Sequence, residues 1–317
     1  MSDRIVVTGA HGFIGRVLVE RLRRDGRDVL PVTRAVLAAR AGSAGPLEYA
    51  GFAHWPELLA GTRGVVHLAA RAHVVRDAAT NPLAEFRRAN VAGTERLLEA
   101  AVRCGVPRFV FVSSIGVLGS DSGPRAFTAA DPPLPAEPYA VSKWEAEQLV
   151  ISRTAGTGTQ AVIVRPPLVY GPGVKGNFLR LLRLVHGGLP LPFAGLEARR
   201  SFVGVDNLCG LLATCIEHPA AAGRTLLVAD GEDVTLPELL AAIGRGLGRP
   251  ARLFRAPWGL LEALAKLAGR GGDLARLAGS LRVDDSATRQ LLGWQPSVRF
   301  EEGIRAMAEW YLEARTS

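Results

Sequence analysis

RIVVTGAHGFIG, residues 4–15, is the stretch that decides the fold. Its first five residues form a short β-branched run, and Gly9, Gly12 and Gly15 follow at three-residue spacing. The next segment, VLVERLRRDG, has apolar residues at helical spacing and ends at Gly26, and DVLPVT then has the composition of a second strand. The order strand, glycine turn, helix, strand predicts the first βαβ unit of a doubly wound parallel sheet.

The same alternation continues through the first half of the chain. Near-continuous apolar runs at 64–70, 108–114 and 160–166 alternate with helical patterns at about 82–104 and 138–153. Such strands are typical of a parallel sheet that is covered on both faces. We therefore predict an α/β fold, a Rossmann-type doubly wound parallel sheet with a smaller C-terminal substrate-binding lobe.

The chain changes character after Pro166. Pro- and Gly-rich segments such as PPLVYGPGVKG and GGLPLPFAG separate short helical patterns. Loops beyond the strand ends are where a doubly wound fold builds its substrate site. We expect an NAD(P)-binding domain over residues 1–165, to which residues 200–225 return, and a substrate lobe made mainly of residues 166–317.

The three glycines predict a site for the pyrophosphate of a dinucleotide, because they permit a tight turn and bring backbone N–H groups against the phosphates. The second strand ends with Thr33 and Arg34, without an acidic residue to bind the ribose 2′-hydroxyl of NAD. Since Arg makes charge-assisted contacts with phosphate, we expect NADP(H) in preference to NAD(H). The alternative cofactor is NAD(H), and Arg34 would then be a solvated surface residue or would stack on the adenine.

A second constellation is Tyr139-Ala-Val-Ser-Lys143, whose first and last side chains share one face of a helix. A tyrosine has an ordinary pKa of about 10, and an ammonium one turn away favours its phenolate. Ser113 and Ser114 end the strand RFVFV, where a hydroxyl can hydrogen-bond a reacting oxygen. Of the two serines we select Ser114, which predicts redox catalysis by Ser114, Tyr139 and Lys143.

Composition excludes several classes of protein. With 48% hydrophobic and 21% charged residues the chain can bury a large core, and its net charge of +8 is spread along it rather than clustered as in a nucleic-acid-binding protein. The three cysteines lack zinc or disulfide spacing, so we expect no metal site.

The N-terminus has no signal-peptide pattern, and no apolar stretch reaches 18 residues, so we expect a cytoplasmic protein without a membrane span. The stretch 258–281 is interpreted as a core-facing or lid helix, with a membrane-surface helix as the alternative.

These motifs together resemble the extended short-chain dehydrogenase/reductase family, in the branch that is similar to UDP-glucose 4-epimerase and its nucleotide-sugar relatives. The motifs that carry the resemblance are TGAHGFIG, HLAA, NVAGT, VSSIGVLG, YAVSK and RPPLVYGPG. Within that branch, YGPGVKGNFLRLL and RRSFVGVDNL look most similar to UDP-4-keto-6-deoxy-N-acetylhexosamine 4-reductases of bacterial polysaccharide pathways.

The resemblance implies a role for each matching residue. It makes Tyr139 the acid/base, Lys143 the ligand of the nicotinamide ribose, and Ser114 the hydrogen-bond partner of the sugar C4 oxygen. On the substrate side it implies that Asn177 and Arg200 bind the nucleotide diphosphate and that Phe193 flanks the uracil. The implied cofactor contacts, beside Tyr139 and Lys143, are Gly9, Gly12, Phe13, Ile14, Gly15, Arg34, Leu68, Ala69, Ala70, Asn90 and Pro166.

Three positions depart from the family pattern. Ala53-His54-Trp55 stands where relatives often have an acidic residue that contacts the adenine. Leu168 replaces the Asn of the RxxNVYGP pattern, and Val117-Leu118-Gly119 replaces VYG after the catalytic serine. These changes affect the adenine site, one diphosphate contact and the sugar pocket.

Our leading hypothesis is reduction of the C4 ketone of a UDP-4-keto-6-deoxy-N-acetylhexosamine by NADPH, with Tyr139 as the proton donor. The alternative is a UDP-hexose or N-acetylhexosamine 4-epimerase with tightly bound NAD, which uses the same residues. A remote alternative is a non-catalytic nucleotide-binding protein on the same fold. We also expect a homodimer formed through the helices at 82–104 and 138–153.

Overall fold

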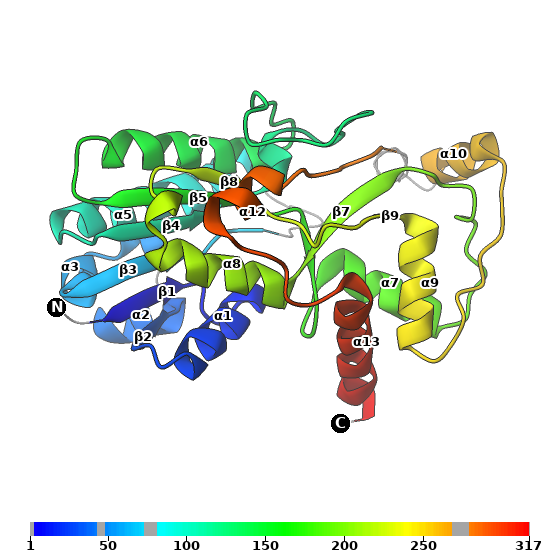
Figure 1. Ribbon diagram of the computed structural model, residues 1–317, viewed down its shortest axis with the longest axis horizontal. Coiled ribbons are helices and arrows are strands. Elements are labelled where there is room, and N and C mark those ends of the chain that lie inside the picture. The colour runs from blue at the N-terminus through cyan, green and yellow to red at the C-terminus, as the bar shows by residue number, and fades with distance from the viewer. Residues whose placement is uncertain (1–2, 43–47, 73–80, 268–278, 317) are drawn as a thin grey trace.

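The computed structural model describes residues 3–42, 48–72, 81–267 and 279–316. Its first lobe is built on a six-stranded parallel sheet with the strand order β2-β1-β3-β4-β5-β8 (Figure 1). The strands are β1 Arg4–Thr8, β2 Val29–Val32, β3 Thr62–His67, β4 Arg108–Val112, β5 Gln160–Arg165 and β8 Thr225–Leu227. The chain leaves β1 toward β2 and then crosses to β3, which opens a crevice at the carboxyl ends of β1 and β3. The predicted fold class is confirmed.

Helices cover both faces of this sheet because alternate residues of each strand point to opposite sides. Val110 and Val112 of β4 belong to one apolar cluster, and Phe109 and Phe111 belong to another. The first cluster is closed by α1 (Phe13–Arg24) and α8 (Val205–Glu217), and the second by α3 (Trp55–Leu59), α5 (Gly93–Arg103) and α6 (Pro138–Thr154). The helix α2 (Arg34–Arg40) follows β2.

The second lobe holds a three-stranded sheet with the order β6-β7-β9, seen on the right of Figure 1. Its strands are β6 Leu168–Tyr170, β7 Arg199–Gly204 and β9 Asp233–Thr235. The helices α7 (Gly176–His186), α9 (Leu236–Gly246) and α13 (Phe300–Thr316) pack around one apolar cluster beside this sheet. The other α-helices of the described residues are α4 (Pro82–Phe86), α10 (Trp258–Leu267) and α12 (Ser286–Leu292).

The segment 200–225, expected to return to the first domain, divides between the lobes. β7 pairs with β6 and β9 in the small sheet, whereas α8 packs on α1 and the next strand, β8, pairs with β5. The stretch expected as one helix from 258 to 281 contains α10, and residues 268–278 lie outside the described part. No helix within the described residues is both long and apolar enough to cross a membrane.

A buried carboxylate joins the two lobes. Asp230 accepts hydrogen bonds from the Tyr170 hydroxyl (2.7 Å), the Gly204 N–H (3.0 Å) and the Asn207 amide (2.7 Å). Asn207 in turn accepts from the backbone of Val298, just before α13. Burial raises the pKa of Asp230 above its ordinary value. This carboxylate ties β6, β7 and α8 together at the boundary between the lobes.

Candidate active site

The glycine turn leaves room for no side chain at two of its positions. A Cβ atom on Gly15 would lie 2.3 Å from the carbonyl oxygen of Gly9, and one on Gly9 would lie 2.8 Å from the backbone nitrogen of Ala69. Gly9 has a φ of +68°, in the left-handed region that favours glycine. Gly12 is the N-cap of α1, so the free N–H groups at Phe13 and Ile14 begin the helix at the mouth of the crevice. This backbone cradle fits the pyrophosphate of a dinucleotide.

Leu68, Ala69 and Ala70 follow β3 directly, at the same edge of the sheet. The Ala69 N–H donates to the Thr8 hydroxyl at 3.3 Å, which brings the end of β3 against the end of β1. The glycine turn and the HLAA segment therefore lie side by side at one edge of the sheet, and both contain predicted cofactor residues.

Tyr49 also reaches the glycine turn, which sequence reasoning missed. Its hydroxyl accepts from the Gly9 N–H at 3.1 Å and donates to the carbonyl of Val32 at 3.1 Å, so it bridges the carboxyl ends of β1 and β2. Its ring stacks on Trp55, with centroids 5.7 Å apart. A single tyrosine in an irregular segment carries no signal that could have revealed this role.

Arg34 is the first residue of α2, at the end of β2 where an adenosine ribose would lie. Thr33 caps this helix by accepting a hydrogen bond from the Val36 N–H at 3.2 Å. The Arg34 side chain is exposed and makes no ion pair with the other described residues. It is therefore open to an anionic ligand.

Tyr139 and Lys143 lie one turn apart at the start of α6. The Tyr139 ring meets Phe86 edge-on at 5.9 Å, and the Lys143 ammonium lies 4.1 Å from the centroid of the Phe111 ring on β4. Burial raises the pKa of Tyr139 to about 12 and lowers that of Lys143 to about 7. In the described part of the chain, no group hydrogen-bonds the Tyr139 hydroxyl or the Lys143 ammonium, so both are open to ligands.

The two serines after β4 differ in exposure. Ser113 is 4% exposed and its hydroxyl has no hydrogen-bond partner among the described residues. Ser114 is partly exposed, and its hydroxyl accepts from the Gly116 N–H at 3.1 Å, which caps a short 3-10 turn. A Cβ on Gly116 would lie 3.5 Å from that of Ala140, so this turn packs on the first turn of α6, beside Tyr139.

Asn90 is 1% exposed and lies in a π-helical segment, Arg87–Ala92, that interrupts the helix expected over 82–104. Its amide accepts from the Arg71 N–H (2.7 Å) and donates to the Arg71 carbonyl (3.2 Å) and to the Ser142 hydroxyl (3.0 Å). Ser142 donates to the Tyr139 carbonyl at 2.7 Å. Asn90 thus ties the segment after β3 to α6, the helix that carries Tyr139 and Lys143.

A buried histidine extends this network to β1. The Thr94 hydroxyl donates to the Asn90 carbonyl (2.6 Å) and therefore accepts from His67 Nε2 (2.9 Å), so His67 Nδ1 accepts from the Thr8 hydroxyl (2.7 Å). Burial, together with the Lys143 charge, lowers the pKa of His67 to about 3, so the ring is neutral. This chain of hydrogen bonds runs from the glycine turn to Asn90, and the sequence predicted only its ends.

The predicted substrate residues come from three places in the second lobe. Asn177 is exposed on the first turn of α7, and Phe193 lies partly buried against the apolar cluster of that lobe. Arg200 of β7 donates to the Gly279 carbonyl at 2.8 Å, and the charge of Asp121 acts on it. Burial lowers the Arg200 pKa. Leu168 is 39% exposed on β6.

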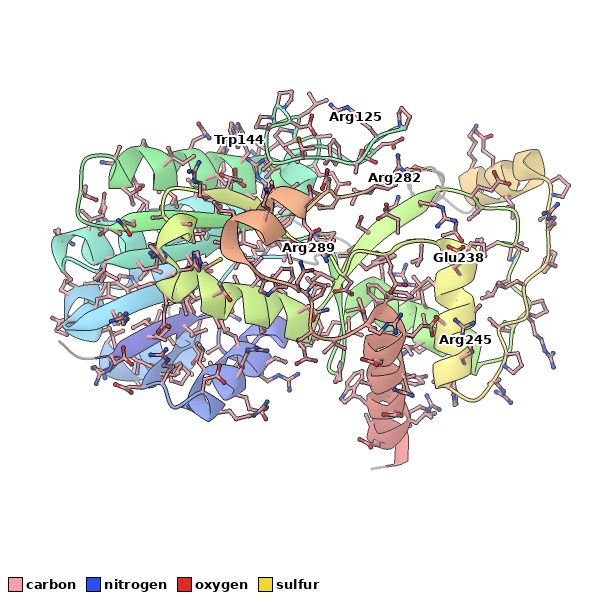
Figure 2. All side chains as sticks on the ribbon, in the orientation of Figure 1. Arg125, Trp144, Glu238, Arg245, Arg282 and Arg289 are labelled. Atoms are coloured by element: carbon pink, nitrogen blue, oxygen red, sulfur yellow. The ribbon has the colours of Figure 1, made fainter. Side chains whose placement is uncertain are left out.

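The loop between Ser114 and Tyr139 is held by the segment 279–284 of the C-terminal part (Figure 2). The Phe127 N–H donates to the Arg282 carbonyl, and the Asp284 N–H donates to the Phe127 carbonyl, both at 2.8 Å. The same segment pairs with β7 through Leu281 and Ser201 at 2.9 Å. It therefore connects β7, which carries Arg200, with the loop between Ser114 and Tyr139.

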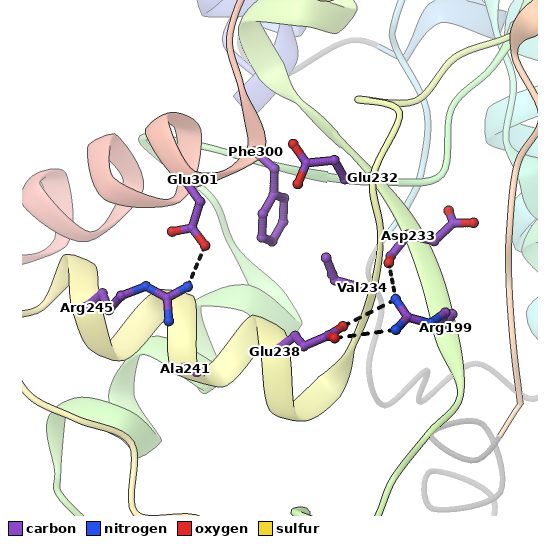
Figure 3. A pocket seen from close by; sticks show the side chains of 9 residues that line it. All are labelled: Arg199, Glu232, Asp233, Val234, Glu238, Ala241, Arg245, Phe300 and Glu301. Carbon is purple, nitrogen blue, oxygen red and sulfur yellow. Dashed lines mark hydrogen bonds and ion pairs between the residues drawn. The ribbon is translucent and has the colours of Figure 1, made fainter.

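A pocket of about 520 Å³ lies away from Tyr139, between β9, α9 and the start of α13 (Figure 3). Arg199 pairs with Glu238, and Arg245 with Glu301, so two of its four carboxylates are neutralised. None of its lining residues is among the predicted site residues. The lining residues are Arg199, Glu232, Asp233, Val234, Glu238, Ala241, Arg245, Phe300 and Glu301. In the described part of the chain, His, Cys, Asp and Glu form no cluster that could hold a metal ion.

Residues 5–229 match the model of the NAD dependent epimerase/dehydratase family. The chain belongs to this family. The expected resemblance is thereby confirmed at the level of the epimerase/dehydratase enzymes, and the reductase subclass stays a prediction.

Members of this family align with the whole chain. A UDP-glucose 4-epimerase of Vibrio cholerae is 39% identical over 320 residues, covering 99% of this chain and 97% of the relative. A dTDP-glucose 4,6-dehydratase of Streptomyces griseus is 30% identical over 336 residues, covering 100% and 96%. The structure of MoeE5 in complex with UDP-glucuronic acid and NAD is similar with a TM-score of 0.77 and 28% identity, over 98% of this chain and 99% of MoeE5. Together with the cradle at the glycine turn, these likenesses support a nicotinamide dinucleotide as the cofactor.

Proposed function

We propose that this enzyme is a UDP-hexose or UDP-N-acetylhexosamine 4-epimerase that uses NAD and the residues Ser114, Tyr139 and Lys143. The observation that carries the proposal is the buried ammonium of Lys143, one turn from the Tyr139 phenol, with both groups open to ligands. The naming of the Vibrio cholerae relative as a UDP-glucose 4-epimerase supports the same substrate class. This name supports the epimerase over the 4-keto reductase that the sequence alone favours.

In this mechanism Tyr139 accepts the proton of the sugar C4 hydroxyl and later returns it to the C4 oxygen. The Lys143 ammonium stabilises the phenolate, which offsets the burial that raises the Tyr139 pKa. Ser114, partly exposed at the strand end, donates a hydrogen bond to the C4 oxygen. Bound NAD supplies the hydride acceptor and donor. With NAD held at the glycine turn and by Lys143, Ser114 and Tyr139 would hold the C4 oxygen while the configuration at C4 is inverted.

Substrate binding is proposed for the second lobe. Arg200 would clamp the diphosphate, because a partly desolvated guanidinium makes strong charge-assisted bonds to phosphate oxygens. Asn177 would add a second contact and Phe193 would flank the uracil. Leu168, in place of the family Asn, removes one polar contact, so Arg200 would carry a larger share of diphosphate binding.

A second candidate, the UDP-4-keto-6-deoxy-N-acetylhexosamine 4-reductase, is favoured by Arg34. Its exposed guanidinium at the end of β2, with no carboxylate beside it on the strand, suits the 2′-phosphate of an exchangeable NADPH. An epimerase can retain its cofactor, whereas a reductase must release and replace it. Cofactor exchange therefore separates the two candidates.

The test begins with the dinucleotide that co-purifies with the protein. The protein is then incubated with UDP-glucose, UDP-N-acetylglucosamine and a UDP-4-keto-6-deoxy-N-acetylhexosamine while NADH and NADPH absorbance is followed. An epimerase interconverts the C4 epimers without net consumption of cofactor. Stoichiometric oxidation of NADPH with the 4-keto sugar would instead establish the reductase.

Two tyrosine variants provide the control. Tyr139→Phe should reduce either activity by at least about 100-fold, because it removes the proton-transferring group. Tyr311→Phe removes the hydroxyl of a buried tyrosine on α13, in the second lobe, and should retain activity. Full activity of Tyr139→Phe, or no turnover of any of these sugars by the wild type, would refute the proposed function.

A further inference from the structure

Glu147 and Arg165 form a bidentate ion pair in the interior of the first lobe. Arg165 Nε donates to Glu147 Oε1 at 2.9 Å, and Nη2 donates to Oε2 at 2.6 Å. The two side chains are 0% and 5% exposed. Burying two charges costs several kcal/mol, and apolar residues of similar volume often give a protein at least as stable. Stability alone therefore does not explain why these two charges are buried.

The location of the pair points to that role. Glu147 lies one turn after Lys143 on α6, so Tyr139, Lys143 and Glu147 follow one another along one face of the helix. Arg165 is the last residue of β5, beneath the catalytic helix, and its guanidinium lies 5.9 Å from the Trp144 ring, labelled in Figure 2. The pair thus anchors the turn of α6 that follows the catalytic lysine.

The groups that face Lys143 come from three strands and its own helix. The Phe111 ring of β4 attracts the ammonium through a cation–π contact at 4.1 Å, and His67 of β3 is neutral. Tyr139 is uncharged, and Arg165, which is hydrogen-bonded to Glu147, is not among the charges of the described residues that act on Lys143. Among the residues that the structure describes, the carboxylate that acts on Lys143 is that of Glu147.

We propose that Glu147, oriented by Arg165, is a positioning residue that keeps Lys143 charged at the cofactor site. In a buried site a carboxylate one turn away opposes the desolvation that favours the neutral amine. Arg165 holds this carboxylate in one orientation through two hydrogen bonds, so the ammonium is ready to stabilise the Tyr139 phenolate. The inference rests on the proposed function for its consequence in catalysis, but the charge state of Lys143 can be measured without substrate.

The chain offers a direct readout because it contains three lysines, Lys143, Lys175 and Lys266. With lysine labelled with ¹³C at Cε, the pH dependence of each Cε resonance reports the protonation of its amine. Lys175→Arg and Lys266→Arg assign the other two signals. The Lys143 titration is recorded for wild type with and without saturating NAD, and then for Glu147→Gln.

Glu147→Gln should lower the Lys143 midpoint by about one pH unit, because it removes the charge and retains the size of the side chain. The matched control is Glu145→Gln on the same helix, which breaks an exposed pair with Arg87 and should leave the midpoint unchanged. A Glu147→Met/Arg165→Met double variant restores apolar packing without either charge. It should fold as stably as the wild type, yet show the same lowered midpoint.

The double variant keeps the proposal testable where Glu147→Gln fails to fold. A Lys143 midpoint within about 0.2 pH unit of the wild type in both variants overturns the proposal, since a packing role alone would give this result. In the active enzyme, the alkaline limb of the pH profile of kcat should move to lower pH by the same amount as the NMR midpoint of Lys143. A moved midpoint with an unmoved limb also overturns the positioning role. If the wild type turns over no UDP-sugar, the proposed function is refuted, but the titration of Lys143 still tests the role of Glu147.

Discussion

Gly15→Ala should abolish tight binding of the dinucleotide while leaving most of the fold in place. The new Cβ would lie 2.3 Å from the Gly9 carbonyl oxygen and 2.8 Å from the Ala10 Cα, both backbone atoms. Ordinary contact begins at 3.4 Å, so the overlap is 3.4 − 2.3 = 1.1 Å. Because neither partner is a flexible side chain, the start of α1 must move away from the turn by about this distance.

The expected rise of the Kd for NAD follows from the position of the start of α1 beside the predicted pyrophosphate site. Its first N–H groups would point at the pyrophosphate of a bound dinucleotide, and a shift of this size would remove about one charge-assisted hydrogen bond, worth roughly 2–3 kcal/mol. The Kd for NAD should therefore rise about 30- to 150-fold. Isothermal titration calorimetry measures this Kd, and circular dichroism and the thermal midpoint check the fold.

Gly259→Ala provides the matched control, because a Cβ at that position on α10 meets nothing within 4 Å. It should leave NAD binding unchanged and stabilise its helix slightly. If Gly15→Ala binds NAD within about threefold of the wild type, the glycine turn is not a close-packed pyrophosphate cradle and this reasoning is refuted.

Three further predictions concern the cofactor, the lobe boundary and the oligomer. Arg34→Ala should raise the Kd for NADPH about tenfold and leave that for NADH unchanged in fluorescence titrations; an equal loss for both would exclude a 2′-phosphate contact. Tyr170→Phe should cost about 2 kcal/mol in urea unfolding at pH 8 and less at pH 4, because the lost hydroxyl stabilises the ionised form of Asp230. The raised pKa of Asp230 means that folding favours its protonated form. In the wild type, the contribution of Asp230 to the free energy of unfolding is therefore full at low pH and is lost as the pH rises through that raised pKa. A loss of stability in Tyr170→Phe that does not change with pH would contradict this prediction. Ile151→Arg, at a 49% exposed position of α6, should convert the expected homodimer to a monomer in light scattering, whereas Leu189→Arg on the second lobe should not; a monomeric wild type removes the dimer.

The elements that the sequence predicted well are those that a local pattern defines. β1, the glycine turn and α1 follow one another within about twenty residues, and their order alone implies a dinucleotide fold. The four-residue spacing of Tyr139 and Lys143 places them on one helical face wherever that helix packs. The helix expected over 82–104 was predicted less well, because the π-helical turn that holds Asn90 depends on tertiary contacts with Arg71 and Ser142.

The sequence by itself therefore determined the fold class and the glycine turn, and it selected Tyr139 and Lys143 as candidate catalytic residues, since these depend on periodicity and short spacing. Tertiary structure alone decided the contacts between residues far apart along the chain: Tyr49 on Gly9, His67 between Thr8 and Thr94, and Arg165 on Glu147. Each of these depends on which strands become neighbours, and in what register. A strand order is set by the packing of the whole sheet and its helices, so no local stretch of sequence contains it.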